Sequence, residues 1–269
     1  MTRLDPAAVS SELRVRAVVG LVLALGAVTA ILLGGASLWV VMSAVGIGMV
    51  GEWGKLIDLP SRLVRLMQFT LGVPLAVMAP RPLGAGAEYF TLGLLIGAAL
   101  FALAATRRPW AAAGILYVGL PVLGLLLIRD QPRGLLFCFW TFMLVWACDI
   151  GAYFAGRAIG GARLAPVISP NKTWSGLLGG VLGAALLGAV FHHYYGLPWR
   201  LTLATPALAL VAQAGDLFES WLKRRAGVKD SGTLLPGHGG LLDRLDGLAP
   251  VAPIAAFLVM LPQVRGFWA

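Results

Sequence analysis

The stretch of the chain that is richest in groups able to bind phosphate runs KDSGTLLPGHGGLLDRLDG, residues 229–247. It brings acidic and basic side chains close together, and Gly237, Gly239 and Gly240 surround His238. Glycines in such a setting let backbone N–H groups approach phosphate oxygens closely. A GHGG sequence alone is a weak signal, but the Lys-Asp and Asp-Arg-x-Asp sequences that flank it strengthen it. We therefore expect this stretch to contact an anionic substrate.

Three acidic residues, Asp149, Asp216 and Glu219, lie within or at the end of long apolar segments. A carboxylate in hydrocarbon is costly, so such residues usually face a polar cavity and have a partner. The plainer alternative is an acid that reaches the membrane interface from a helix end. Asp149, Tyr153 and Arg157 are spaced four apart and would share one helix face, which favours a polar site.

A second polar face follows from Asp216, Glu219, Ser220 and Lys223, which stand at positions i, i+3, i+4 and i+7. A carboxylate cluster beside cations suits Mg²⁺ with phosphates completing its shell. It also suits the proton or ion relay of a transporter. The loop favours the first use, because it supplies more phosphate-binding donors than an ion path needs. These residues therefore indicate phosphoryl or nucleotidyl transfer, with metal and cations neutralising the migrating group.

Membrane helices must position these residues. Of 269 residues, 59% are hydrophobic and 12% are charged, and the mean hydropathy is +0.84. No polar stretch is long enough for a large soluble domain. Apolar runs of about 20 residues predict an all-α, polytopic membrane protein with about nine spans. The expected span cores are residues 17–34, 37–54, 64–80, 89–106, 110–128, 134–156, 175–195, 201–221 and 247–264.

The basic residues predict the orientation of these spans. The net charge is +9, from 21 Lys and Arg against 12 Asp and Glu. In the nine-span arrangement, sixteen of the 21 fall on the side that holds the N-terminus. The positive-inside rule places that side in the cytoplasm, although some of these charges could also hold anionic lipid or phosphate. No basic arm or aromatic-basic face indicates nucleic-acid binding.

The pattern divides the chain into an N-terminal membrane region, residues 1–133, and a C-terminal catalytic membrane region, residues 134–269. The second region has two loops on the expected cytoplasmic side. One is GRAIGGARLAPVISPNKTW, residues 156–174, and the other contains residues 229–247. Between them, GLLGGVLGAALLGA, residues 176–189, has glycines four apart, which is typical of closely packed helices.

The sequence SWLKRRAGVKDSGTLLPGHGGLLDRLD, residues 220–246, resembles the signature of the phosphatidate cytidylyltransferase (CDP-diacylglycerol synthase) family. That signature has a serine, Lys-Arg, Lys-Asp, a Pro/Gly-x-His-Gly-Gly turn and Asp-Arg-x-Asp. Its fixed positions are all present, as Ser220, Lys223, Arg224, Lys229, Asp230, Pro236, His238, Gly239, Gly240, Asp243, Arg244 and Asp246.

The resemblance extends upstream into DIGAYFAGRAIGGARLAPVISPNKTWSG, residues 149–176. This segment is similar to the family's Asp–Ala-Tyr–Gly-Arg helix and its Ser-Pro-Lys-Lys-Thr-x-Glu-Gly loop. Glu52 stands where the family often has a second-span glutamate. Two positions depart from the pattern: Asn171 replaces the first lysine and Ser175 replaces the glutamate, so one charge of each sign is missing.

The resemblance implies the reaction CTP + phosphatidate → CDP-diacylglycerol + pyrophosphate. It also implies dependence on Mg²⁺, a monovalent cation such as K⁺ as a further candidate cofactor, and a homodimer. Asp216 and Asp243 would be the metal ligands, with Asp149 as a further candidate. The protein would be integral to the bacterial inner (cytoplasmic) membrane, and its active site would face the cytoplasm.

In the expected mechanism the lipid phosphate attacks the α-phosphorus of CTP, and metal and cations offset the repulsion between the two anions. His238 would either donate to phosphate or stabilise its turn, and Asp230 and Asp246 would orient the cations. The candidate catalytic residues are Lys223, Lys229, His238, Asp243, Arg244 and Asp246. The candidate substrate-binding residues are Ser169, Asn171, Lys172, Thr173, Ser220, Arg224, Gly239 and Gly240. A CTP-dependent transferase or kinase for another lipid, or a transporter, are the alternatives.

Overall fold

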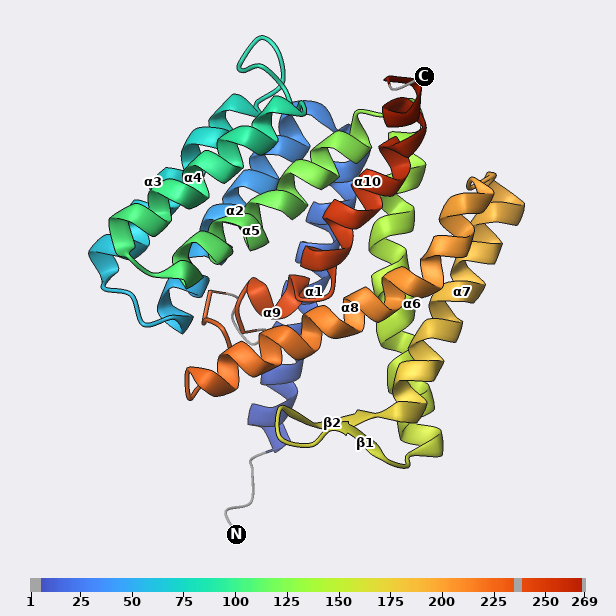
Figure 1. Cartoon of the computed structure of the whole chain (residues 1–269). Helices are drawn as coiled ribbons and strands as arrows, with labels where there is room; N and C mark the ends of the chain where they lie inside the picture. The colour runs from blue at the N-terminus through green and yellow to red at the C-terminus, as the bar shows by residue number, and fades with distance from the viewer. Residues whose placement is uncertain (1–5, 235–238, 268–269) are drawn as a thin grey trace.

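The computed structural model describes residues 6–234 and 239–267 (Figure 1). A long helix overlaps each range that was predicted to span the membrane, and a short helix, α9, precedes the last one. The helices are α1 Pro6–Leu33, α2 Gly35–Leu56, α3 Ser61–Val77, α4 Phe90–Thr106, α5 Pro109–Arg129, α6 Gly134–Ile159, α7 Trp174–Tyr195, α8 Trp199–Arg225, α9 Leu242–Leu245 and α10 Leu248–Phe267.

Five of these helices, α2, α5, α6, α7 and α8, are long and apolar enough to cross a membrane. Apolar segments of α1, α4 and α10 are shorter, at 10–17 residues. The expected class, an all-α membrane protein, is therefore confirmed in its main feature. The total of nine spans, the orientation and the division at residue 133 stay predictions.

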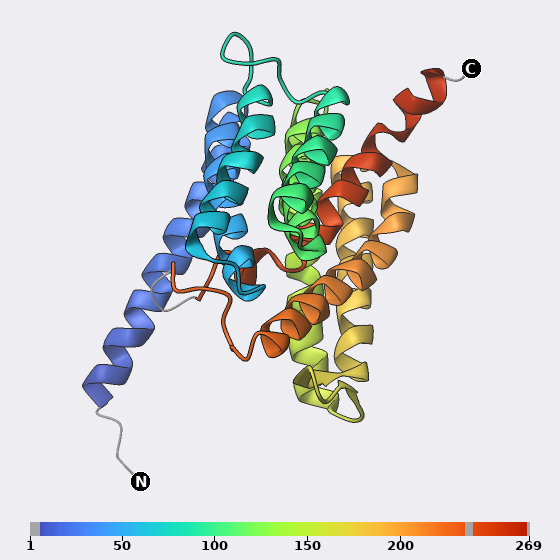
Figure 2. The ribbon, with the colours of Figure 1, turned by 60° about the vertical axis from the view of Figure 1, so that its left-hand side comes forward.

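The helices gather into a bundle that buries a continuous apolar core. Helices α2, α3, α4 and α5 pack side by side, while α10 lies against α5 and α8 (Figures 1 and 2). Large side chains at the centre of this core, among them Trp53, Met67, Leu71 and Ile115, are fully buried. The first half of the chain thus supplies a packed wall, against which the polar segments of the second half are placed.

Helices α6 and α7 lie along one another through their glycines (Figure 1). A Cβ atom at Gly179 would lie 2.8 Å from the carbonyl oxygen of Gly151, and one at Gly180 would lie 2.8 Å from that of Cys148. Only a hydrogen atom fits at such positions, so the two backbones touch. The close packing expected for residues 176–189 is present.

The segment that connects α6 to α7 is a β-hairpin, where the sequence predicted an irregular loop. Strands β1 Arg163–Ala165 and β2 Ser169–Thr173 are antiparallel, with Arg163 opposite Thr173 and Ala165 opposite Ser169. The Thr173 hydroxyl then accepts a hydrogen bond from the Gly176 N–H and caps α7. The purely α-helical expectation is therefore wrong for this short stretch, which brings β2 to the side of α8.

Candidate active site

The end of α8 carries a lysine that joins the helix to the following loop. Lys223 Nζ lies 3.2 Å from Glu219 Oε1, one turn earlier, and 2.6 Å from Asp243 Oδ1 in α9. The side chains of Lys223 and Glu219 are only 14% and 2% exposed. The helical spacing that predicted a common face is reflected in these contacts. A buried ammonium between two carboxylates is a strongly polar centre within an apolar bundle.

Asp243 is surrounded by hydrogen-bond donors. Its Oδ2 atom accepts from the backbone N–H of Ser231 and of Gly240, each at 2.8 Å. Burial raises the pKa of Asp243, but the hydrogen bonds from Lys223 and from the Gly240 and Ser231 N–H groups outweigh it, so the pKa falls to about 2. Asp243 therefore holds its negative charge at any physiological pH.

Glycine is required beside this carboxylate. Gly239 has φ +77°, a conformation that residues with a Cβ rarely adopt, and a Cβ there would lie 2.8 Å from Asp243 Oδ2. Gly239 of the GHGG turn thus leaves room for the carboxylate of Asp243. The contact of Gly239 and Gly240 with substrate phosphate stays a prediction. His238 and Pro236, which belong to the same turn, lie outside the described residues.

Glu52 in α2 is a second carboxylate that holds the loop, although it was not among the predicted site residues. Its Oε1 accepts from the Leu241 N–H at 3.0 Å and its Oε2 from the Leu242 N–H at 2.9 Å. The Ser231 hydroxyl lies 3.0 Å from Glu52 Oε2 and 2.9 Å from Asp243 Oδ2, and its single hydrogen serves one of them at a time. Glu52 is only 4% exposed. The sequence signal for Glu52 was the family resemblance, in which a glutamate often stands in the second span.

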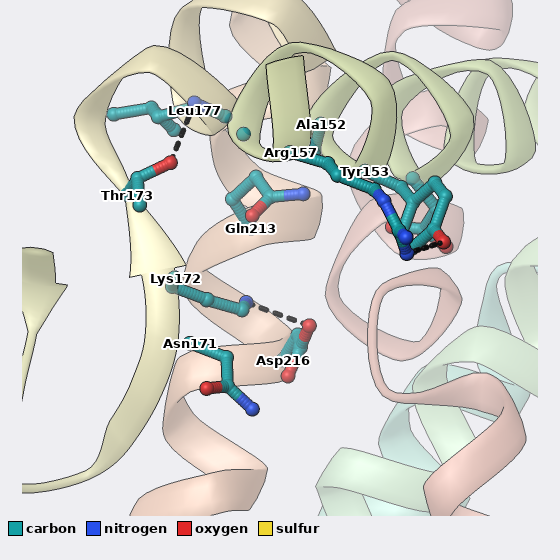
Figure 3. A pocket seen from close by; sticks show the side chains of 12 residues that line it. Ala152, Tyr153, Arg157, Asn171, Lys172, Thr173, Leu177, Gln213 and Asp216 are labelled. Atoms are coloured by element: carbon teal, nitrogen blue, oxygen red, sulfur yellow. Dashed lines mark hydrogen bonds and ion pairs between the residues drawn. The ribbon is translucent and has the colours of Figure 1, made fainter. Parts of the chain in front are cut away.

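The hairpin reaches α8 through one ion pair. Lys172 Nζ on β2 lies 2.6 Å from Asp216 Oδ2 (Figure 3). The Ser220 hydroxyl donates to Asp216 Oδ1 at 3.4 Å. The geometry of the lysine contact is that of a close ion pair rather than of an aligned hydrogen bond. A residue from the first polar loop and an acid from α8, predicted separately, therefore meet.

A polar cavity of about 660 Å³ opens beside this ion pair, between α6, β2, α7 and α8 (Figure 3). The Arg157 guanidinium donates to the Tyr153 hydroxyl at 3.0 Å, so the predicted face of α6 contributes both to its wall. The polar residues that line it are Asp149, Tyr153, Arg157, Asn171, Lys172, Thr173, Gln213 and Asp216. This first cavity offers cations and amides to an anionic, hydrogen-bonding ligand.

A second cavity of about 510 Å³ lies between α1, α6, α9 and α10. Its polar end is lined by Asp149, Asp216, Asp243, Arg244 and Asp246. Its remaining wall is apolar and includes Gly20, Ala24, Ala27, Phe142 and Trp146. Asp149 and Asp216 line both cavities, so these two carboxylates stand where the cavities adjoin.

The carboxylates of the second cavity are hard oxygen donors, which are the ligands that Mg²⁺ prefers. In the described part of the chain, no three Asp, Glu, His or Cys side chains form a group that could hold a metal by themselves. Mg²⁺ at nucleotide sites is usually held by one or two carboxylates together with phosphates and water. The donors present therefore fit this metal when substrate phosphates complete its shell.

The other predicted residues are placed less centrally. Ser169 lies on β2 opposite Ala165, Arg224 donates to the Val228 carbonyl at 3.4 Å, and Lys229 and Asp230 are exposed. Burial raises the pKa of Asp246, and the charge of Asp216 raises it further. Asp246 accepts the Gly247 N–H at 2.7 Å.

The two departures from the family pattern have different surroundings. Asn171 lines the first cavity, where its amide takes the place of a lysine charge. The Ser175 hydroxyl donates to the Gly160 carbonyl at 2.5 Å and lies 2.9 Å from the Thr173 hydroxyl. Ser175 therefore joins the two ends of the hairpin through neutral hydrogen bonds.

An α-helical membrane protein with paired acids and lysines at one end of its bundle is the class that these features define. The family model described as the cytidylyltransferase family matches residues 14–261, so the chain belongs to this family. A phosphatidate cytidylyltransferase of Brucella suis biovar 1 is 39% identical over 244 residues, which is 84% of this chain and 89% of that protein. One from Rickettsia felis is 35% identical over 216 residues, 74% of this chain and 92% of that protein.

Proposed function

We propose that this chain transfers the cytidylyl group of CTP to phosphatidate, giving CDP-diacylglycerol and pyrophosphate. The observation that carries the proposal is the meeting of three separate segments: Lys172–Asp216 joins β2 to α8, and Lys223–Asp243 joins α8 to α9. These pairs adjoin two cavities that share Asp149 and Asp216. Two relatives that span most of the chain carry the name phosphatidate cytidylyltransferase.

The reaction joins two anions. A phosphate oxygen of phosphatidate forms a bond to the α-phosphorus of CTP, and the bond from that phosphorus to the β-phosphate oxygen breaks, so pyrophosphate leaves with the electron pair. The attacking oxygen is already anionic, so no strong base is needed. The protein must instead orient the two substrates and neutralise their charge.

The residues that line the two cavities support one site for each substrate. The first cavity is polar, with Lys172, Asn171 and Gln213 in its wall, and suits the phosphates and base of CTP. The second combines a charged end at Arg244 with an apolar wall, which suits a lipid phosphate with its acyl chains. The two reacting phosphates would then meet at Asp149 and Asp216.

Asp216 and Asp243 would hold Mg²⁺, with Asp149 as a further ligand and K⁺ as a second candidate cation. Mg²⁺, when bound, supplies a counter-charge to the phosphates and to the leaving pyrophosphate. Lys223 fixes the position of Asp243, and Lys172 fixes that of Asp216. Arg244 would contact the lipid phosphate. Lys229 and Arg224 line neither cavity and stay candidates for substrate binding, and His238 keeps the two alternative roles predicted from the sequence. Ser220 keeps Asp216 in place through its hydroxyl.

The site would face the cytoplasm of a bacterial cell, since CTP is made there and the basic residues favour that side. A homodimer is part of the same proposal. Both can be tested separately from the activity, by labelling single cysteines from either side of the membrane and by measuring the mass of the purified protein in detergent.

The activity is tested by following the label of CTP into lipid. Purified protein with phosphatidate and Mg²⁺ should move radioactive phosphorus from the α position of CTP into a lipid product, and a γ label should appear in pyrophosphate. A lipid kinase would give the opposite pattern. ATP, GTP and UTP serve as controls and should give little lipid product. Absence of any CTP-dependent liponucleotide would overturn the proposal.

A further inference from the structure

A second group of basic side chains lies apart from the candidate active site, around a cavity of about 600 Å³. The ends of α2 and α8 and the junction between α4 and α5 form this cavity. Lys55, Arg107, Arg108 and Arg225 line it, with Asp58 as the one acid among its lining residues. We call these four basic residues the interfacial cation cluster. Their excess of positive charge creates a local field that an anion would complement.

Two members of the cluster are held in position by the protein. The guanidinium of Arg108 donates from Nη1 to the carbonyl oxygens of Ile57 and Asp58, at 2.9 and 3.2 Å. The guanidinium of Arg225 lies over an aromatic ring, 5.3 Å from the centre of Trp110. A cation fixed in this way loses little conformational freedom when it binds an anion.

The other two members keep their charges available. Lys55 and Arg107 are exposed, and neither makes a side-chain hydrogen bond or ion pair with another residue in the described parts of the chain. A cavity that combines two positioned cations with two uncommitted ones resembles a binding site more than a network of internal ion pairs.

Two residues that line this cavity have a left-handed backbone conformation. Asp58 and Arg107 have φ values of +53° and +54°, and within the described residues they are the only residues other than glycine with positive φ. Arg107 is the C-terminal cap of α4, where a left-handed residue is common, and aspartate adopts this conformation more readily than most residues. These turns fix the backbone of both segments beside the cavity. Both of these residues line the same cavity.

The cavity lies where membrane helices end. α2 ends at Leu56, α5 begins at Pro109 and α8 ends at Arg225, and each of these helices is long and apolar enough to cross a membrane. We therefore infer that their common end lies near the level of the lipid headgroups, whichever way the protein faces. Trp110 packs there against Trp221, at 5.6 Å between ring centres, and tryptophan is typical of this depth.

We propose that the interfacial cation cluster binds the phosphate group of an anionic phospholipid, at a site separate from the one that carries the reaction. Guanidinium and ammonium groups bind phosphate through charge-assisted hydrogen bonds. Basic clusters at membrane surfaces attract anionic lipid headgroups. The proposal commits to a lipid rather than to a soluble phosphate, because the cavity opens at the ends of the spans. It does not depend on the proposed transferase activity.

The test is a lipid titration of the whole protein in an uncharged detergent, followed by native mass spectrometry. Dioctanoyl phosphatidylglycerol is the anionic probe and dioctanoyl phosphatidylcholine the zwitterionic one. The test variant is Lys55→Gln/Arg107→Gln. The matched control is Arg62→Gln/Arg65→Gln, which removes the same charge from exposed positions that do not line this cavity. Lys55→Gln alone is the second variant if the double variant does not fold.

The test variant should bind phosphatidylglycerol about tenfold more weakly than the unmodified protein, with phosphatidylcholine binding unchanged. The control variant should stay within about twofold. Equal binding of the two lipids, or an equal loss in the control variant, would overturn the proposal. An excess of inorganic phosphate should leave the lipid bound. Complete displacement by phosphate would assign the site to a soluble anion and would also overturn the lipid proposal.

Discussion

The two polar segments that approach α8 are held in very different ways. The loop that follows α8 is fixed by two carboxylates, Glu52 and Asp243, which accept hydrogen bonds from its backbone. The hairpin before α7 touches α8 through the single ion pair of Lys172 and Asp216. The two segments therefore differ in what holds them in place. The loop after α8 is held by contacts to its own backbone, whereas the hairpin takes its position from α6 and α7, which it connects.

The strongest test of the fixed half is Asp243→Asn. The neutral amide would remove the charge opposite Lys223 and would present N–H donors to the N–H groups of Ser231 and Gly240. We expect cytidylyl transfer to fall by about 100-fold or more, as when a preorganised charged group is removed from an active site. The measurement is lipid product formed from labelled CTP. The matched control, Asp130→Asn, lies beyond the far end of α5 and should keep nearly full activity. Near-normal activity of Asp243→Asn would contradict the role given to this carboxylate.

Glu52→Gln tests whether the loop owes its position to a residue far away in the sequence. The amide of glutamine can accept at only one of the two atoms that now accept hydrogen bonds from the loop. We expect a loss of about 1–3 kcal/mol in the free energy of unfolding, the usual cost of an unsatisfied buried group. The melting temperature in detergent and the transfer rate should both fall. Glu88→Gln, which alters an exposed pair with Arg81, should change neither. An unaltered melting temperature for Glu52→Gln would argue against the role of Glu52 in holding the loop.

Lys172→Gln tests the half of the site that the hairpin carries. Because one ion pair holds the hairpin to α8, its loss should leave the melting temperature nearly unchanged. The KM for CTP should rise about tenfold, which corresponds to one lost charge-assisted contact. Steady-state kinetics with CTP as the varied substrate give this value. Arg163→Gln on the neighbouring strand is the control and should not alter KM. A large fall in melting temperature with unchanged KM would assign Lys172 to the scaffold instead.

A pH series tests the role of Asp243 in the loop through a smaller effect on the melting temperature. The folded pKa of Asp243 is about 2, below the ordinary value of 3.8. The stability that this group contributes is therefore fully present above its ordinary pKa and is lost as the pH falls through the folded value. The difference in melting temperature between the unmodified protein and Asp243→Asn should stay constant at neutral pH and narrow below about pH 4. A difference that widens on acidification would contradict the assigned pKa direction.

Local patterns in the sequence predicted the parts of this structure that depend on neighbours along one helix. Apolar runs located each long helix, and four-residue spacing placed Tyr153 with Arg157 and Glu219 with Lys223. Such pairs follow from the geometry of a single helix. The resemblance to a known family then supplied the chemistry, and membership of the cytidylyltransferase family bears this out.

The contacts between segments could not be predicted in this way. Glu52 accepts hydrogen bonds from Leu241 and Leu242, which follow it by 189 and 190 positions in the chain. No periodicity within one helix encodes such a pairing. The hairpin was missed because strands of three and five residues are too short to show an alternating pattern. The sequence also contained no sign that Gly239 and Gly240 leave room for Asp243 and Glu52. Their predicted contact with substrate phosphate stays a prediction.

The glycine contact between α6 and α7 has a consequence for how sequence change reaches the site. The two backbones touch near Gly151 and Gly179, so neither helix can slide past the other. The hairpin connects the ends of α6 and α7, so the position of Lys172 depends on how these two helices pack. A methyl group added at Gly151 or Gly179 should therefore shift the hairpin and move the charge of Lys172 relative to Asp216.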